Sequence, residues 1–245
     1  MRYPKGRSSS VFVTAVLLAT MSGCASSTGP STLNAVMPGP GSTFTYLNTM
    51  DSSGVIIYSD TTVSTVLGII SYAGYSNVMM IQEKYLAKNW GGYTDTLYAR
   101  LLSNGDIAEY LSTISNDRAW FYLPFGSKQS QTQSFGTMLL SYGSVGFDSM
   151  TQNSTYEGLS VVQVKGSPAL AQTVNVTSRT SKTTGPSNFD SSLDTVQYYS
   201  IVSNGIPFAG EKVLSNIAFY ESGDVRGEAS AYPTTTTLID YKILP

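Results

Sequence analysis

From residue 41 to the C-terminus, short runs of apolar and β-branched residues alternate with turn residues, and long segments with a helical period are not the recurring pattern. Turn signals separate such runs at 51–54, 104–106, 204–205 and 221–224. Asn-Gly, present at the second and third of these, is typical of a hairpin whose type I′ turn requires positive φ at both central residues. The pattern therefore predicts four antiparallel hairpins.

Further strands are predicted where β-prone residues cluster, at 120–125, 137–142, 159–166 and 173–179. In the last of these, Val174 and Val176 face one side and the intervening polar residues face the other, which indicates one buried and one wet face. The polar stretch 180–192 is predicted to be a loop.

The segment 77–90 fits two elements. As a helix it would place Val78, Ile81 and Tyr85 on one face, and as a strand it would place Val78 and Met80 toward the core. We favour the strand.

These elements predict an all-β domain, an antiparallel meander of hairpins that forms a curved sheet, an open barrel or a sandwich. Residues 42–245 are enough for one such domain, and the absence of a fixed-period repeat argues against a propeller or solenoid. The residues before it, up to 41, are small, polar and rich in Pro and Gly, which predicts a flexible linker.

The N-terminal residues predict an exported protein. Residues 1–7 carry three basic side chains and no acid, and they precede about ten apolar residues at 11–20. A membrane-spanning helix needs roughly 20 apolar residues, so the shorter segment is typical of a secretory signal peptide.

The tetrapeptide Met21-Ser22-Gly23-Cys24 follows this segment and resembles the lipobox of bacterial lipoproteins. The resemblance implies that residues 1–23 are cleaved as a signal peptide and that lipid is attached to Cys24, which begins a linker over 24–41. Cys24 is the only cysteine, so no disulfide can form within the chain. The membrane is thus the first expected partner, and Ala25 implies localisation to the outer membrane of the cell envelope.

Composition excludes several function classes. Without residues 1–23 the chain has 11 basic and 16 acidic side chains, a net charge of −5, so nucleic acid is not an expected partner. The chain has no histidine, which excludes a Ser-His-Asp triad and the common zinc sites. We predict no catalytic residue, no metal site and no cofactor. The acids occur singly, at turns (Asp51, Asp106, Asp224) or within strands (Glu109, Asp240).

Aromatic residues are the one positive indication of a ligand. Trp90, Tyr93, Trp120 and Tyr122 could stack on sugar rings, although the same residue types also serve as ordinary sheet residues, which is the favoured interpretation.

Three functions remain. The first is a noncatalytic envelope lipoprotein that binds a hydrophobic ligand or a protein partner; its plan of lipidated cysteine, polar tether and consecutive hairpins is similar to periplasmic lipoprotein-localisation factors. The second is a carbohydrate-binding lipoprotein at the cell surface, and the third a glycoside hydrolase that uses carboxylates alone. An apolar cavity would favour the first, an exposed aromatic row the second, and a cleft with paired acids the third.

Overall fold

The structure is a computed structural model, and it describes residues 36–86, 92–111, 119–135, 138–139, 146–147, 149–181, 191–201, 204–222, 225–230 and 233–245. These residues belong to one unit, 32–245, which is described here by itself.

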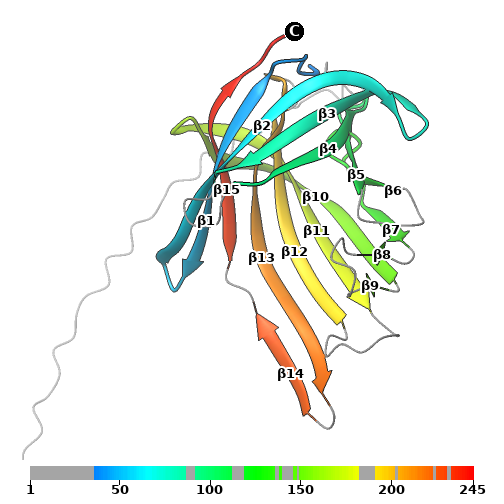
Figure 1. Cartoon of the computed structure of the whole chain (residues 1–245), viewed down its shortest axis with the longest axis vertical. Coiled ribbons are helices and arrows are strands. Elements are labelled where there is room, and N and C mark those ends of the chain that lie inside the picture. Colours follow the sequence, from blue (N-terminus) through cyan, green and yellow to red (C-terminus); the bar gives the residue numbers. More distant parts are fainter. Residues whose placement is uncertain are drawn as a thin grey trace, which may run out of the picture. The chain divides into compact units, whose positions relative to one another are not determined.

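The described residues form an all-β domain, as the sequence predicts (Figure 1). Its strands are β1 (Thr43–Ser52), β2 (Val55–Tyr72), β3 (Tyr75–Tyr85), β4 (Thr94–Leu101), β5 (Ile107–Leu111), β6 (Ala119–Leu123), β7 (Gln131–Phe135), β8 (Met138–Leu139), β9 (Gly146–Phe147), β10 (Ser149–Val164), β11 (Ser167–Ser181), β12 (Ser191–Ile201), β13 (Ile206–Ser222), β14 (Val225–Ser230) and β15 (Thr234–Lys242).

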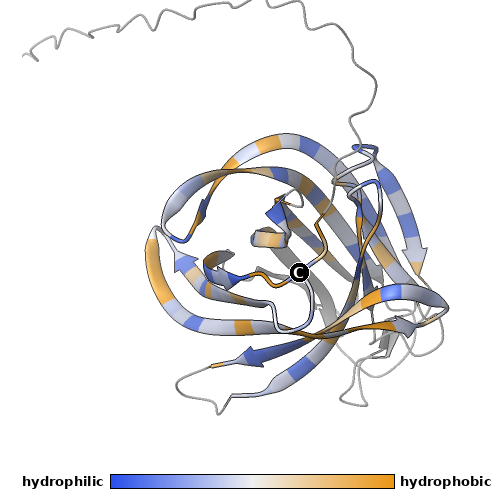
Figure 2. Ribbon diagram, turned by 90° about the horizontal axis from the view of Figure 1, so that it is seen from above, coloured by the Kyte–Doolittle hydropathy of each residue, from blue (hydrophilic) through white to orange (hydrophobic). Residues whose placement is uncertain are grey.

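Thirteen of these strands make one antiparallel sheet, and twelve of the thirteen follow the order β6-β5-β4-β3-β2-β1-β15-β13-β12-β11-β10-β7. β14 pairs with β13 off this path, while β8 and β9 form a separate pair. Most neighbours in the sheet are consecutive along the chain. The exceptions are three pairs, β1 with β15, β13 with β15, and β7 with β10. Seen from above, the sheet curls into a nearly closed, barrel-like ring with the C-terminus over its opening (Figure 2).

The two ends of the sheet, β6 and β7, meet at a seam that side chains close. The side-chain amide of Gln133 on β7 accepts a hydrogen bond from Tyr122 N (2.9 Å) and donates one to Trp120 O (3.0 Å). Ser154 on β10 adds a hydrogen bond from its Oγ to Tyr122 O (3.3 Å). The amide of Gln133 thus takes the place of a backbone ladder, and it satisfies backbone groups that the last strand would otherwise leave unpaired.

Hairpins occur at all four predicted positions, but the turn type predicted for Asn-Gly is wrong. Positive φ at two consecutive residues occurs instead at Ser53-Gly54, Ala73-Gly74 and Lys165-Gly166, the two-residue hairpins of β1–β2, β2–β3 and β10–β11. At Asn104-Gly105 and Asn204-Gly205 only the glycine has positive φ. The reason is loop length: Leu101 pairs with Ile107 and Ile201 with Ile206, so neither turn is a two-residue loop.

The strand prediction for 77–90 is confirmed by β3, and residues 87–91 lie outside the described residues. The predicted inward face is wrong. Met79, Ile81, Glu83 and Tyr85 line the interior cavity described below, whereas Val78 packs against Trp120 and its neighbours on the opposite face. Both faces of β3 are therefore buried at Val78 and Met79, so apolar residues there carry no information about which face is inward.

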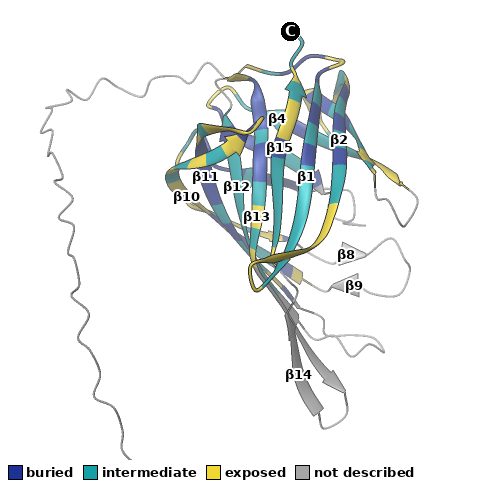
Figure 3. Cartoon of the chain, turned by 90° about the vertical axis from the view of Figure 1, so that its left-hand side faces the viewer, coloured by how far each residue is buried: buried dark blue, intermediate teal, exposed yellow. Residues whose placement is uncertain are grey.

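The remaining strand predictions are confirmed where they can be compared. The segment 120–125 contains most of β6, 159–166 contains the end of β10, and 173–179 lies within β11, where Val174 and Val176 are fully buried. Figure 3 shows burial along the other strands, such as the exposed first part of β2 and its more buried remainder. Of 137–142, β8 covers Met138–Leu139, and residues 137 and 140–142 lie outside the described part. The predicted loop 180–192 is shorter than expected, because β11 extends to Ser181 and β12 begins at Ser191, with 182–190 not described.

The end of the predicted linker packs on the sheet. Pro38 and Gly39 are buried, and Gly39 N donates to Leu244 O (2.7 Å). Ser42 Oγ accepts a hydrogen bond from Leu244 N (2.9 Å). The ordered domain therefore begins a few residues before position 42, with its first and last residues held together.

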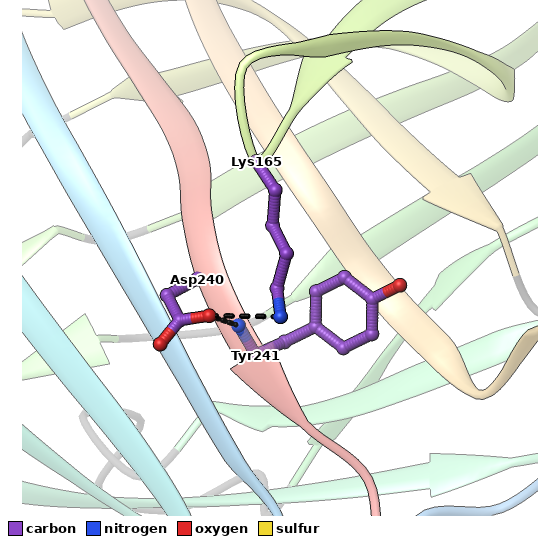
Figure 4. Close-up of polar contacts among 3 residues, drawn as sticks. All are labelled: Lys165, Asp240 and Tyr241. Atoms are coloured by element: carbon purple, nitrogen blue, oxygen red, sulfur yellow. Dashed lines mark hydrogen bonds and ion pairs between the residues drawn. The ribbon is translucent and has the colours of Figure 1, made fainter.

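The tip of the β10–β11 hairpin is attached to β15, a strand that does not neighbour either of them in the sheet (Figure 4). Lys165 Nζ pairs with Asp240 Oδ1 at 2.9 Å and lies 4.3 Å from the ring centre of Tyr241. Lys165 N also donates to Leu238 O at 3.0 Å. The hydrogen bond and charge of Lys165 hold the pKa of Asp240 below its ordinary value. The exposed ion pair contributes little energy by itself, so the backbone hydrogen bond and the burial of Val164 fix this contact.

Candidate ligand-binding cavity

The barrel-like sheet encloses a cavity of about 1330 Å³. Its lining comes from β1, β2, β3, β4, β5, β12, β13 and β15, together with Pro38 from the segment before β1. The cavity exists because alternate side chains of these strands point to one face, and the ring closes that face around a space that they do not fill. A drug-sized or lipid-sized molecule is within the range that such a volume accommodates.

Apolar side chains form much of the wall. They are Phe44, Val66, Met79, Ile81, Leu97 and Phe208, and they belong to or pack against one hydrophobic cluster. Val66 and Met79 are almost completely buried. An apolar ligand that contacted these residues would remove its own apolar surface and that of the wall from water. This burial is the main source of affinity for such molecules.

Four carboxyl groups also line the cavity, and no Lys, Arg or His is among its described lining residues. Asp60 on β2 accepts hydrogen bonds from Asn48 Nδ2 (2.7 Å) and the Tyr58 hydroxyl (3.1 Å). Glu83 on β3 accepts hydrogen bonds from Ser64 Oγ (3.0 Å) and the Tyr85 hydroxyl (2.8 Å). These two carboxyl groups are thus held by neutral donors that leave their charge uncompensated.

The other two carboxyl groups belong to Glu109 on β5 and Glu211 on β13. Burial, together with the smaller effects of the charges of Glu83 and Glu211, raises the pKa of Glu109 to about 7. Burial and the charge of Glu83 also raise the pKa of Glu211, against a smaller opposing effect of a hydrogen bond from Thr236. The charge of Glu83 therefore acts on both Glu109 and Glu211 across the cavity, and the pKa of Glu109 lies near neutral pH.

Tyrosines complete the wall and the rim. The Tyr46 hydroxyl donates to Phe208 O (3.0 Å), and burial raises the pKa of this hydroxyl. At the rim, Tyr85 stacks on Tyr93 with ring centres 4.1 Å apart and planes inclined by 12°. Tyr93 is 60% exposed, so its ring is available at the entrance. These rings can contact either an apolar chain or a cation.

The structure separates the aromatic residues that the sequence singles out. Tyr93 lies at the cavity rim, whereas Trp120 is only 7% exposed and packs with the half-buried Tyr122 on the face opposite the cavity. Tyr75 and Arg100 cover that group, with the guanidinium 3.8 Å from the Tyr75 ring centre. The three described residues do not form one exposed row, and Trp90 lies outside the described residues.

The predicted attachment site, Met21, Ser22, Gly23 and Cys24, also lies outside the described residues. The carboxyl groups of the cavity were missed by sequence reasoning, which treated the acids as isolated. A usable signal was present: Glu83 continues the two-residue alternation of Met79 and Ile81, and Glu109 lies two residues after the buried Ile107. An acid in phase with core residues is a candidate interior group.

No protein-family model matches the chain, and no curated protein or solved structure is significantly similar to it. Within the described ranges, no three acidic or other ligating side chains are grouped so that they could hold a metal ion. The described part of the chain also contains no helix with the length and apolarity needed to cross a membrane.

Proposed function

We propose that this chain is a lipid-anchored protein of the bacterial envelope whose β-domain binds a hydrophobic ligand inside the barrel. The observation that carries the proposal is the cavity of about 1330 Å³, with its wall of aliphatic and aromatic side chains. A closed sheet that merely stabilised itself would fill this space with larger side chains, since protein interiors are close-packed. An open apolar interior is the arrangement that barrels use to hold a small ligand.

Binding is expected to depend on the free space of the cavity. The test uses the full chain carrying Cys24→Ser, titrated with the neutral fluorophore N-phenyl-1-naphthylamine. We expect a saturable rise in fluorescence at a stoichiometry of one. Leu97→Trp places a large ring in the cavity and is expected to weaken binding about tenfold, a change of about 1.4 kcal/mol.

Leu170→Trp is the matched control, because Leu170 is 63% exposed on β11 and does not line the cavity. It should leave the affinity unchanged. Binding that does not saturate, or equal affinities for the two tryptophan variants, would contradict a ligand site inside the barrel.

The anchor is tested separately in living cells. Cys24→Ala removes the thiol that receives lipid, so the protein is expected to move from the membrane fraction to the soluble fraction and to stop incorporating labelled palmitate. Ser27→Ala, a neighbouring substitution in the linker, should change neither property. A Cys24→Ala protein that remained with the membranes would show that attachment does not depend on this residue.

Two alternatives use other features. Glycan binding would use the exposed Tyr93, but Trp120 and Tyr122 pack on the opposite face of the sheet and do not form an exposed row with it. Hydrolysis would use Glu109 as an acid, since a pKa of about 7 suits proton transfer near neutral pH. We favour noncatalytic binding because the apolar wall of the cavity provides a binding surface for a hydrophobic ligand whether or not a reaction takes place there.

A further inference from the structure

The cavity combines an apolar wall with an uncompensated negative charge. Asp60, Glu83, Glu109 and Glu211 line it, and its described lining includes no cationic side chain. Surface acids are easily solvated, but carboxyl groups inside a barrel lose part of their hydration, and their mutual repulsion adds to this cost. A neutral or anionic apolar ligand would displace more water from these carboxyl groups and would supply no positive charge to compensate them.

Glu109 has fewer hydrogen-bond donors than the other carboxyl groups of the cavity. The structure gives it no hydrogen-bond donor among the described residues, although Asp60 and Glu83 each have two. Its side chain lines the same cavity as those of Glu83 on β3 and Glu211 on β13. Because Glu109 lines the cavity and no described side chain donates to it, a bound ligand is in a position to supply a hydrogen-bond donor that the chain does not.

The aromatic rings favour the same kind of partner. Tyr58, Tyr85 and Tyr93 lie together at the cavity, and the hydroxyls of the first two already donate to Asp60 and Glu83. The electron-rich faces of such rings attract alkylammonium groups, which bind carboxylates and aromatic faces together. Phe44, Ile81 and Leu97 provide the apolar surface that an inorganic cation could not use.

We propose that the ligand is an organic cation, an amine or quaternary ammonium group on an apolar body, and that its charged group binds between Glu83, Glu109 and Glu211. This inference rests on the proposed function, because it specifies the chemistry of the ligand in the same cavity. The apolar body contacts the aliphatic wall while the ammonium group supplies the charge and the hydrogen-bond donors that the carboxyl groups lack.

The test compares three ligands with the same ten-carbon chain, decylammonium, decanol and decanoate, as competitors of N-phenyl-1-naphthylamine at pH 8 on the full chain with Cys24→Ser. We expect decylammonium to displace the fluorophore at a concentration about tenfold lower than decanol, and decanoate to be the weakest. Equal potency of the three ligands, or a preference for decanoate, would overturn the charge inference while leaving the hydrophobic site intact.

Variants locate the effect. Glu109→Gln combined with Glu211→Gln keeps the side-chain shapes and removes the charges, so the preference for decylammonium over decanol should fall to less than about threefold. Glu157→Gln, an exposed strand residue outside the cavity, is the matched control and should retain the full preference. A preference that persisted in the double variant would place the cation elsewhere. If the fluorophore itself fails to bind the wild-type cavity, the proposed function and this inference fail together.

Discussion

Replacing Asp106 by alanine is expected to lower the free energy of unfolding by about 3–5 kcal/mol. Asp106 is 4% exposed, and its Oδ1 accepts hydrogen bonds from Gly126 N and Ser127 N, both at 2.8 Å. Its Oδ2 accepts a third from Asn104 Nδ2 at 2.8 Å. Alanine would leave these donors without their acceptor, and urea unfolding followed by tryptophan fluorescence measures the loss.

The effect is large because Asp106 joins two loops that pack backbone against backbone. A Cβ added at Gly126 would lie 1.7 Å from Asn104 O, so no side chain fits between the loops. Next to this contact, Phe125 is completely buried in the cluster that also contains Val174 and Val176. Loosening the β4–β5 turn therefore exposes one end of the hydrophobic core.

Asp51→Ala is the control, since the side chain of Asp51 also caps a hairpin turn but accepts one exposed hydrogen bond, from Gly54 N at 2.8 Å. We expect this variant to lose about 0.5–1 kcal/mol. Asp106→Asn keeps one accepting oxygen and should fall between the two alanine variants. Similar losses for Asp106→Ala and Asp51→Ala would show that the loop contact does not stabilise the fold.

Glu109→Gln is expected to stabilise the protein at alkaline pH. Burial raises the pKa of Glu109 from 4.5 to about 7, so the folded state binds a proton more tightly than the unfolded state. The wild-type free energy of unfolding should therefore fall as pH rises from about 5 to 8, by up to about 3 kcal/mol from this group. Glutamine has no charge to bury, and the variant should lose most of that decline.

The ionisable groups near Glu109 determine how much the free energy of unfolding of Glu109→Gln still depends on pH. Glu211 has a pKa raised in the same direction, so it leaves a smaller decline in the variant, while Glu83 repels both carboxylates. Tyr198, whose pKa burial raises well above its usual range, stays neutral throughout this interval. Unfolding curves at several pH values compare the wild type, Glu109→Gln and the exposed control Glu157→Gln. A Glu109→Gln curve parallel to the wild type would show that Glu109 is not the group responsible.

The all-β fold was predictable because its determinants are local. Alternation at Val174 and Val176 and turn residues at the hairpins act over a few positions, and the structure confirms both. The order of the strands in the sheet was not predictable, because β1 pairs with β15 and brings Thr43 beside Lys242. Nothing in either strand alone specifies a partner so distant in the sequence.

The cavity was harder to predict for a related reason. Glu83, Glu109 and Glu211 come from three strands that are separated along the chain, so each appears as an isolated acid in the sequence. Only the curvature of the sheet turns them toward one space. On β3, apolar residues occupy both faces, and Val78 therefore suggested the wrong inward face. Where both faces of a strand are buried, the alternation of apolar and polar residues that identifies the inward face is absent.

The bridge made by Gln133 also affects how copies of the protein behave toward one another. An open sheet has two outer strands whose unpaired amide and carbonyl groups attract the same groups of a second molecule. Here the amide of Gln133 occupies Tyr122 N and Trp120 O on one of those strands, and β7 is placed alongside it. A single side chain thus discourages edge-to-edge polymerisation. If the protein is lipid-anchored as proposed, this protection acts where many copies are crowded on one membrane surface.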